Sequence, residues 1–330
     1  MGNRVLKFMS TKKKSLVSPD ARQKLLAFAS LVVIFIIFSI ASPNFCKFDN
    51  VVGILLATAV NGVLAVGVTY VIITGGIDLS IGTVMTFSAV SAGIIITNMH
   101  MPIGIGIIGA LIAGGLCGLV NGLLIAKAKI PPFIATLGMM LVTKGLSLVL
   151  SGTKPIYFND TPAFSEIAMG TAFGIPNAVV IFLVAAIIGG FILSKTVLGR
   201  YTVALGSNEE AARLSGINVI KWKIIVYVLT GIFAGLAGIL MASRLNSAQP
   251  ALGAGYEMDA ISAVVIGGTS LSGGEGSMVG TVIGAFVITT LTNGLRILSV
   301  PQEWQTVVTG VIVIGAVYMD IVRRRNANKV

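Results

Sequence analysis

Residues 196–223, TVLGRYTVALGSNEEAARLSGINVIKWK, form a charged segment between two long apolar stretches. Within this segment Asn208 can cap a short helix, because its side-chain oxygen can accept from N–H groups of the first turn. Gly216 is typical of the residue that follows the C-terminal end of a helix. The pattern predicts a two-turn helix over 208–216, held at the surface and suited to docking a partner.

The side chains of this short helix are ordered along its axis. Glu209 and Glu210 lie in the first turn, where the helix dipole favours negative charge, and Arg213 lies nearer the end, where it favours positive charge. Positions i, i+3 and i+4 share one face of a helix, and here they form a small, mildly apolar face of Ala211, Leu214 and Ser215.

The composition is that of an integral membrane protein. Of the 330 residues, 55% are hydrophobic and only 11% are charged, and the mean hydropathy is +0.96. Soluble domains carry about 25% charged residues. The 40 glycines fit closely packed membrane helices.

The net charge of +11 could indicate a nucleic-acid partner, but its distribution argues against one. The basic residues lie at the ends of apolar stretches and not in one stripe. His100 is the only histidine, and Cys46 and Cys117 lie in unrelated segments. We therefore expect no disulfide framework, no metal site and no histidine-based catalytic site.

The segment LSGGE (271–275) looks like the signature loop of ATP-binding-cassette ATPases. The phosphate-binding pattern G-x-x-x-x-G-K-[ST] occurs nowhere in the chain, so we expect it to bind no ATP and no other cofactor. A tight connection between two membrane elements is the better interpretation of these residues.

A membrane-crossing helix needs about 20 mostly apolar residues. On this basis we predict an all-α polytopic membrane protein with about ten transmembrane helices. The candidate ranges are 23–41, 51–73, 79–97, 103–126, 133–150, 176–194, 223–243, 258–268, 277–298 and 304–322. The eighth is too short to cross alone and is expected to belong to a broken element around GGTSLSGGEGS (267–277). The first could be a cleaved signal peptide, but its length favours an uncleaved span.

The basic residues predict the orientation, since cytoplasmic loops are enriched in Lys and Arg. With an internal N-terminus, the outer loops contain only Lys47, Lys154 and Arg244. The inner segments contain Arg4, Lys7, Lys12, Lys13, Lys14, Arg22, Lys24, Lys127, Lys129, Lys195, Arg200, Arg213, Lys221, Lys223, Arg323, Arg324, Arg325 and Lys329. We therefore expect both termini in the cytoplasm.

The expected organisation has three parts. A cytoplasmic tail (1–22) precedes a transmembrane domain (23–322), and a second cytoplasmic tail follows (323–330). The transmembrane domain contains a cytoplasmic loop at 195–222, which carries the predicted short helix, and an outer loop at 151–175.

Polar side chains in or near apolar spans usually face the interior of the bundle or a watery path. Amides both donate and accept, as a neutral polyol requires. Asp78 could contact a solute or could cap the following helix by accepting from the N–H groups of Ser80 or Ile81. The candidates for a solute path are Asn61, Asp78, Ser80, Asn121 and Asn293. Each could equally be structural, and Lys144 and Arg296 could extend outward to the interface.

The outer segment SRLNSAQPALGAGYEMDA (243–260) is rich in turn residues and carries several polar groups. Arg244, Gln249, Tyr256, Glu257 and Asp259 could contact a soluble partner or a solute entrance, or the segment could be an ordinary connection.

Three stretches carry a resemblance to a known family: LGRYTVALGSNEEAARLSGI (198–217), GGIDLSIG (75–82) and SAQPALGAGYEMDAISAVVIGGTSLSGGEG (247–276). With the pattern of spans, they resemble the permease subunit of bacterial sugar ABC importers, closest to the ribose-type branch shared with xylose, arabinose and galactoside systems. The resemblance covers about residues 20–325 and is weakest in the loop 151–175.

The resemblance implies a subunit of the bacterial inner membrane that catalyses no reaction. Two copies would line one path, an extracytoplasmic binding protein would deliver the sugar, and a separate cytoplasmic ATPase would use the ATP. That ATPase would dock on residues 208–216. The resemblance implies polar contacts from Glu209, Glu210 and Arg213, and a groove filled by Ala211, Ala212 and Leu214.

Two other classes remain open from the residues. A secondary transporter driven by protons or sodium would need ionisable residues at mid-membrane, and the spans contain few. A membrane enzyme would need titratable groups that face one another, or a metal cluster. One histidine and two distant cysteines do not favour such a site.

Overall fold

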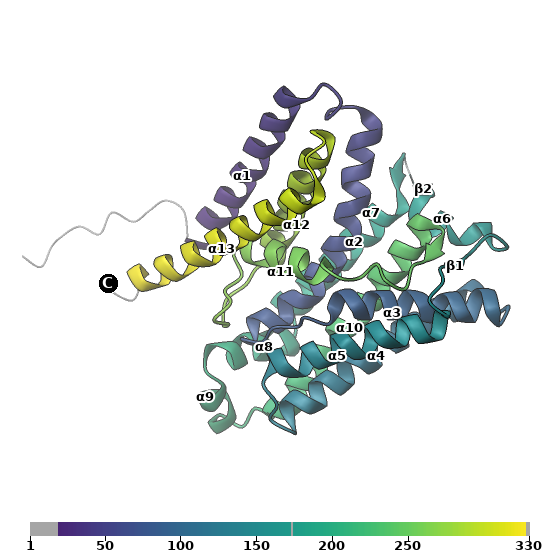
Figure 1. The fold of residues 1–330 in the computed structure, drawn as a ribbon. Helices are drawn as coiled ribbons and strands as arrows, with labels where there is room; N and C mark the ends of the chain where they lie inside the picture. The colour runs from purple at the N-terminus through teal and green to yellow at the C-terminus, as the bar shows by residue number, and fades with distance from the viewer. Residues whose placement is uncertain (1–18, 173, 328–330) are drawn as a thin grey trace, which may run out of the picture.

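The computed structural model describes residues 19–172 and 174–327 (Figure 1). Arg4, Lys7, Lys12, Lys13, Lys14 and Lys329, which contribute to the predicted orientation, lie outside this range. The N-terminal half of the described chain contains α1 (Pro19–Ala41), α2 (Phe48–Ile73), α3 (Ile81–Gly93), η1 (Ile94–Asn98), α4 (Ile103–Ala126), α5 (Pro132–Ser151), β1 (Ile156–Tyr157), η2 (Pro162–Phe164) and α6 (Glu166–Met169). The remainder contains β2 (Thr171–Ala172), β3 (Ile175–Pro176), α7 (Asn177–Lys195), α8 (Val197–Ser207), α9 (Glu209–Leu214), α10 (Val219–Leu245), β4 (Ser247–Ala248), α11 (Tyr256–Ile266), α12 (Met278–Ile297) and α13 (Gln302–Ala327).

Eight helices in the described part are long and apolar enough to cross a membrane: α1, α2, α3 with its continuation η1, α4, α5, α7, α10 and α12. The two remaining predicted spans differ from these eight. The segment at 258–268 corresponds to α11, which has 11 residues and is too short to cross alone, as expected. The segment at 304–322 lies within the 26-residue α13.

The core of the bundle consists of α2, α3, α10 and α12, whose residues are mostly buried. The flanking helices α1, α4, α5 and α7 expose most of their apolar side chains, such as Ile40 and Ile187. An exposed apolar surface of this extent is incompatible with water and is typical of helices in contact with lipid.

Glycines bring α4 and α10 into close contact. A β-carbon on Gly118 would collide with the backbone carbonyl of Tyr227, and one on Gly114 would collide with that of Gly231. Small residues allow such backbone approach, which is the main source of helix association where no hydrophobic effect operates. Gly114 and Gly118 therefore serve packing within the chain.

The described part of the chain also contains four short strands, so the fold is not entirely helical. β1 pairs with β4, placing Ile156 opposite Ala248, and β2 pairs with β3. The described part of the loop 151–175 is therefore a platform of β1, η2, α6 and β2, in which strand pairing and turns satisfy backbone N–H groups.

The charged segment and the strand platform lie at opposite ends of the bundle. α9 precedes α10 and β4 follows it, so the 27 residues of α10, about 40 Å of helix, separate them. Figure 1 shows α9 at the lower left and β1, β2 and α6 on the right.

Candidate functional site

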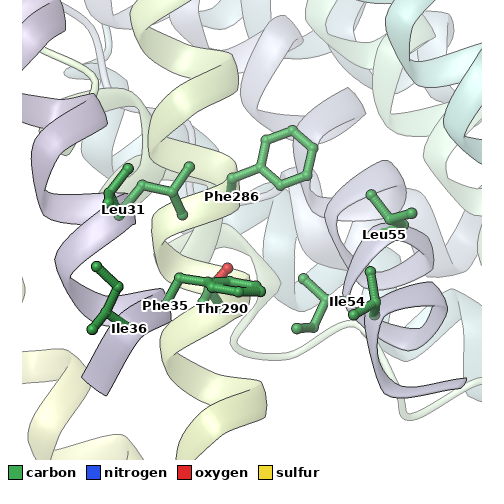
Figure 2. Close-up of a pocket in the computed structure, with 9 residues that line it drawn as sticks. Leu31, Phe35, Ile36, Ile54, Leu55, Phe286 and Thr290 are labelled. Carbon is green, nitrogen blue, oxygen red and sulfur yellow. The ribbon is translucent and has the colours of Figure 1, made fainter. Parts of the chain in front are cut away.

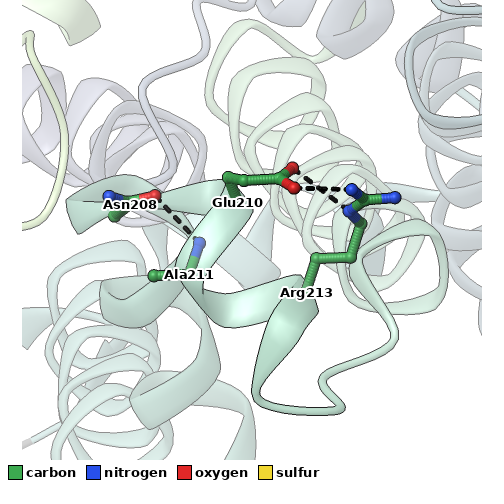
Figure 3. A network of polar contacts seen from close by, with 4 residues as sticks. All are labelled: Asn208, Glu210, Ala211 and Arg213. Carbon is green, nitrogen blue, oxygen red and sulfur yellow. Dashed lines mark hydrogen bonds and ion pairs between the residues drawn. The ribbon is translucent and has the colours of Figure 1, made fainter.

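The predicted short helix is present as α9, and its ends are formed as the sequence indicates. The Ala211 N–H donates to Asn208 Oδ1 at 2.9 Å, which is the expected N-terminal cap (Figure 3). Gly216 has a φ of 83°, in the left-handed region, and its N–H donates to the carbonyl of Arg213 at 3.0 Å.

The charged side chains of α9 pair within the chain. Arg213 donates to both carboxylate oxygens of Glu210, with Nε to Oε2 at 3.1 Å and an Nη to Oε1 at 2.5 Å (Figure 3). Both side chains are exposed, and the hydrogen bond from Arg213 lowers the pKa of Glu210. Lys223 at the start of α10 pairs with Glu209 at 2.6 Å. The Glu210–Arg213 pair therefore lies within α9, and the Lys223–Glu209 pair joins α9 to α10.

Ala212 does not lie on the exposed face of α9, and its expected place in a partner's groove is wrong for this structure. Its side chain is only 5% exposed and packs against Leu205 of α8 and Val219 of α10. In a helix this short only one face can point away from the protein. That face contains Ala211, Ser215 and Leu214, and the Leu214 side chain is 77% exposed.

A second amphipathic helix, α8, supports α9, and the sequence interpretation missed it. The Gly199 N–H donates to Thr196 Oγ1 at 3.4 Å at its start. Tyr201 of α8 meets Trp222 of α10 edge to face, with ring centroids 5.0 Å apart. The available signal was Thr196, a good capping residue, directly after the apolar stretch of α7.

The C-terminal end of α8 contacts two glycine-rich connections. A β-carbon on Gly206 would collide with the carbonyl oxygen of Ile73 at the end of α2 and would lie 2.5 Å from the amide nitrogen of Gly274. The same Gly274 N–H donates to the Ile73 carbonyl at 2.9 Å. The support of α9 therefore touches the α2–α3 and α11–α12 connections by backbone contact.

The five predicted path residues lie in three separate places. Asp78, Ser80 and Asn121 form one buried chain: Asp78 Oδ1 accepts from the Ser80 N–H at 2.9 Å and from its hydroxyl at 2.6 Å, and Asn121 Nδ2 donates to Ser80 Oγ at 3.0 Å. The expected bond from the Ser80 N–H is thus present, just before α3 begins.

The other two path candidates are apart from this chain. Asn293 Nδ2 donates to Asn50 Oδ1 at 3.0 Å, which joins α12 to the start of α2. Asn61 Nδ2 lies 3.5 Å from Asp259 Oδ2, which joins the middle of α2 to α11. The five residues therefore do not form one continuous lining within this chain.

An apolar cavity of about 300 Å³ lies between α1, α2 and α12 (Figure 2). Leu31 and Phe35 of α1, Ile54 of α2 and Phe286 of α12 face it, and Thr290 contributes its one hydroxyl. Such a lining offers a polar solute almost no hydrogen bonds and matches hydrocarbon instead.

The geometry is that of a multi-pass helical protein with an exposed short helix, α9, at one end, and a comparison with known proteins gives its family. Residues 50–317 match the family described as the permease component of the branched-chain amino acid transport system. The chain belongs to this permease family. As a permease component it is a transport subunit and a multi-pass membrane protein, not an enzyme.

Three of the relatives that match this permease are named for sugar transport. The chain is 44% identical over 295 residues to the ribose import permease protein of Escherichia coli K12, a match that covers 88% of this chain and 91% of the relative. It is 44% identical over 321 residues to the ribose import permease protein of Bacillus subtilis 168, which covers 97% and 98%. The L-arabinose transport system permease protein of Escherichia coli K12 is 40% identical over 290 residues, or 87% of each chain. No solved structure matches the chain.

Proposed function

We propose that this chain is the membrane-spanning subunit of an ATP-driven ABC importer for a monosaccharide, namely ribose or a closely related sugar. The observation that carries the proposal is the match at 44% identity, over nearly the full length of both chains, to a permease named for ribose import. The family description mentions branched-chain amino acids, but the named relatives that match this chain import sugars.

In this proposal α9 couples the permease to a separate ATPase, which binds and hydrolyses the ATP. The exposed face of Ala211, Leu214 and Ser215 supports the proposal, since it offers an apolar contact inside a rim of charge. Glu209, Glu210 and Arg213 supply that rim. The contact of Gly206 with the connections after α2 and before α12 gives the docked ATPase a route to the bundle.

We place α9 and both termini in the cytoplasm and the β1–β4 platform outside, in a bacterial inner membrane. The support is the excess of Lys and Arg in the segments on the α9 side. An extracytoplasmic sugar-binding protein would then meet the loop 151–175, and a second copy of the chain would complete the path. The count of about ten spans requires that α13 crosses and that α11 with the adjoining glycine-rich stretch 267–277 crosses as part of a broken element.

Lipid is the partner we propose for the outer surface. Most of the exposed side chains of α1, α4, α5 and α7 are apolar, and α1 also contributes Leu31 and Phe35 to the apolar cavity of Figure 2.

One observation favours an alternative, an ion-gradient-driven secondary transporter. Asp78 is 3% exposed, and Asp259 is partly buried beside Asn61. Acidic groups placed between membrane helices are typical of proton or sodium coupling. The docking surface of α9, however, has no role in such a transporter.

The test uses the chain purified gently from membranes of its host and then sealed into vesicles with the proteins that accompany it. We expect an ABC-type ATPase in near-equal amount and uptake of labelled ribose that requires ATP and persists after ion gradients are collapsed. Leu214→Asp should remove the ATPase from the complex, whereas Leu214→Met should retain it. A chain that purifies alone and transports solute only with an ion gradient would overturn the proposal.

A further inference from the structure

A second cavity, of about 210 Å³, lies between α2, α10, α11 and α12 and is lined by polar as well as apolar side chains. Asn61 lines it halfway along α2, and Arg244 and Arg296 line it from the last turns of α10 and α12. It therefore extends from the middle of the bundle toward the end opposite α9. Its volume is the share that about seven water molecules occupy in the liquid, enough for a small solute.

The side chain of Asn61 points to a ligand in this cavity. It is only 6% exposed, and its Nδ2 lies 3.5 Å from Asp259 Oδ2. Because a carboxylate only accepts hydrogen bonds, this contact fixes the orientation of the amide and leaves Oδ1 as an acceptor. Oδ1 has no hydrogen-bond partner among the residues that the structure describes. A buried acceptor without a donor calls for an explanation, and a donor brought by a ligand provides one.

The backbone that forms one wall of the cavity also points to a ligand. Between β4 and α11 the chain is irregular over residues 249–255, and α11 begins beside the cavity with Tyr256 and Asp259. Irregular backbone within a helical membrane bundle is tolerated where it is covered by protein or lines a watery space. Short helices interrupted in this way commonly form solute sites in transporters.

The chemistry of the lining selects the ligand. Asn61 Oδ1 and the carboxylate of Asp259 accept, the guanidinium groups of Arg244 and Arg296 donate, and the hydroxyls of Tyr256 and Thr292 do both. An inorganic or carboxylate anion would leave the two acceptors unmatched and would be repelled by Asp259. A neutral solute with several hydroxyls satisfies both kinds of group, since every hydroxyl donates and accepts.

We propose that this cavity is a binding subsite for a neutral, polyhydroxylated solute of monosaccharide size, in which Asn61 Oδ1 and Asp259 accept hydrogen bonds from solute hydroxyls and Arg244 donates to a solute oxygen. This inference rests on the proposed function as a sugar permease and adds the residues that hold the solute within this chain. In the proposed orientation the subsite lies in the extracytoplasmic half, where a solute released by a binding protein would first meet the bundle.

The test measures ATP-driven uptake of labelled D-ribose by vesicles that contain the complete importer. Asn61→Leu removes both amide functions at nearly constant volume. Asp259→Asn keeps one oxygen for Asn61 Nδ2 but replaces the other oxygen, which would accept from the solute, by a donating NH2 group. Each should lower uptake at low ribose concentration about tenfold, as expected for the loss of a well-formed buried hydrogen bond. ATP hydrolysis by the same vesicles should remain, which shows that the complex is folded and assembled.

Ser88→Ala is the matched control. Ser88 is also fully buried and its Oγ also has no partner in the described part of the chain, but it lies on α3 and does not line the cavity. Its uptake should equal that of the wild type. If uptake by Asn61→Leu and by Asp259→Asn stays within twofold of the wild-type value, the subsite is overturned, while the proposed function stands.

Equilibrium binding of labelled D-ribose to the purified chain in lipid nanodiscs gives a second measurement. We expect saturable binding that unlabelled pentoses displace and that Asn61→Leu weakens. Displacement by L-leucine or by a sugar-acid anion but not by neutral pentoses would contradict the assignment of a neutral ligand. A wild type that neither transports nor binds ribose would overturn the proposed function and the subsite together.

Discussion

The backbone N–H of Gly274 donates to the carbonyl oxygen of Ile73 at 2.9 Å, across 201 positions of sequence, and so joins the end of α2 to the connection between α11 and α12. Gly206 of α8 packs directly on this bond, because it has no side chain to hold the backbones apart. The junction is the point where the helix that supports α9 meets the core of the bundle.

Gly206→Ala should disturb this junction. The added β-carbon would meet the Ile73 carbonyl and the Gly274 nitrogen, neither of which can rotate away, and forced packing of this kind costs about 1–3 kcal/mol. We expect a lower unfolding temperature of the purified chain and weaker coupling of ATP hydrolysis to uptake. Gly53→Ala is the control, since a β-carbon there meets nothing within 4 Å. Equal stability of the two variants would contradict the tight junction.

Ala211→Trp and Ala212→Trp should have different effects. Ala212→Trp places a large ring between Leu205 and Val219 and should lower the stability of the α8–α9 segment by about 1–3 kcal/mol. Ala211→Trp lies on the exposed face and should leave stability unchanged while it blocks the ATPase. Thermal unfolding and co-purification of the ATPase measure the two effects. Loss of stability in Ala211→Trp would show that α9 is oriented differently.

The cap of α9 can be tested without touching its exposed face. Asn208→Ala removes the acceptor of the Ala211 N–H, and the loss of such a cap costs about 1 kcal/mol. Hydrogen exchange of the Ala211 amide should then be about fivefold faster, the factor that corresponds to this energy. Asn208→Asp keeps an accepting oxygen and should exchange as the wild type does. Unchanged exchange in Asn208→Ala would mean that the cap contributes nothing to α9.

The features that the sequence predicted correctly are local ones. The cap of Asn208 and the left-handed Gly216 follow from residues within one turn of helix, and each long apolar helix follows from its own composition. The inward orientation of Ala212 depends on Leu205 and Val219, which belong to other helices. No local pattern distinguishes it from Ala211.

Long-range contacts explain the rest of what the sequence could not supply. Asn61 and Asp259 are separated by 198 positions, and only the fold places the amide of one beside the carboxylate of the other. The strand pair β1–β4 likewise joins Ile156 to Ala248. Each of these strands has only two residues, too few to show the alternating pattern that predicts a strand. Polar residues can be recognised as candidates from sequence, but their grouping into three places required the structure.

The buried chain of Asp78, Ser80 and Asn121 separates the importer from the ion-coupled alternative. Asp78→Asn retains an oxygen that can accept from the N–H and hydroxyl of Ser80, so the start of α3 should stay intact and ATP-driven uptake should persist. Asp78→Ala leaves both donors unmatched in a buried place and should cost about 1–3 kcal/mol of stability. Thermal unfolding and uptake are measured on the same preparations. If Asp78→Asn folds as the wild type but no longer transports, the charge or the proton of this carboxyl is required for transport, and coupling to an ion gradient becomes the better explanation of the buried acid.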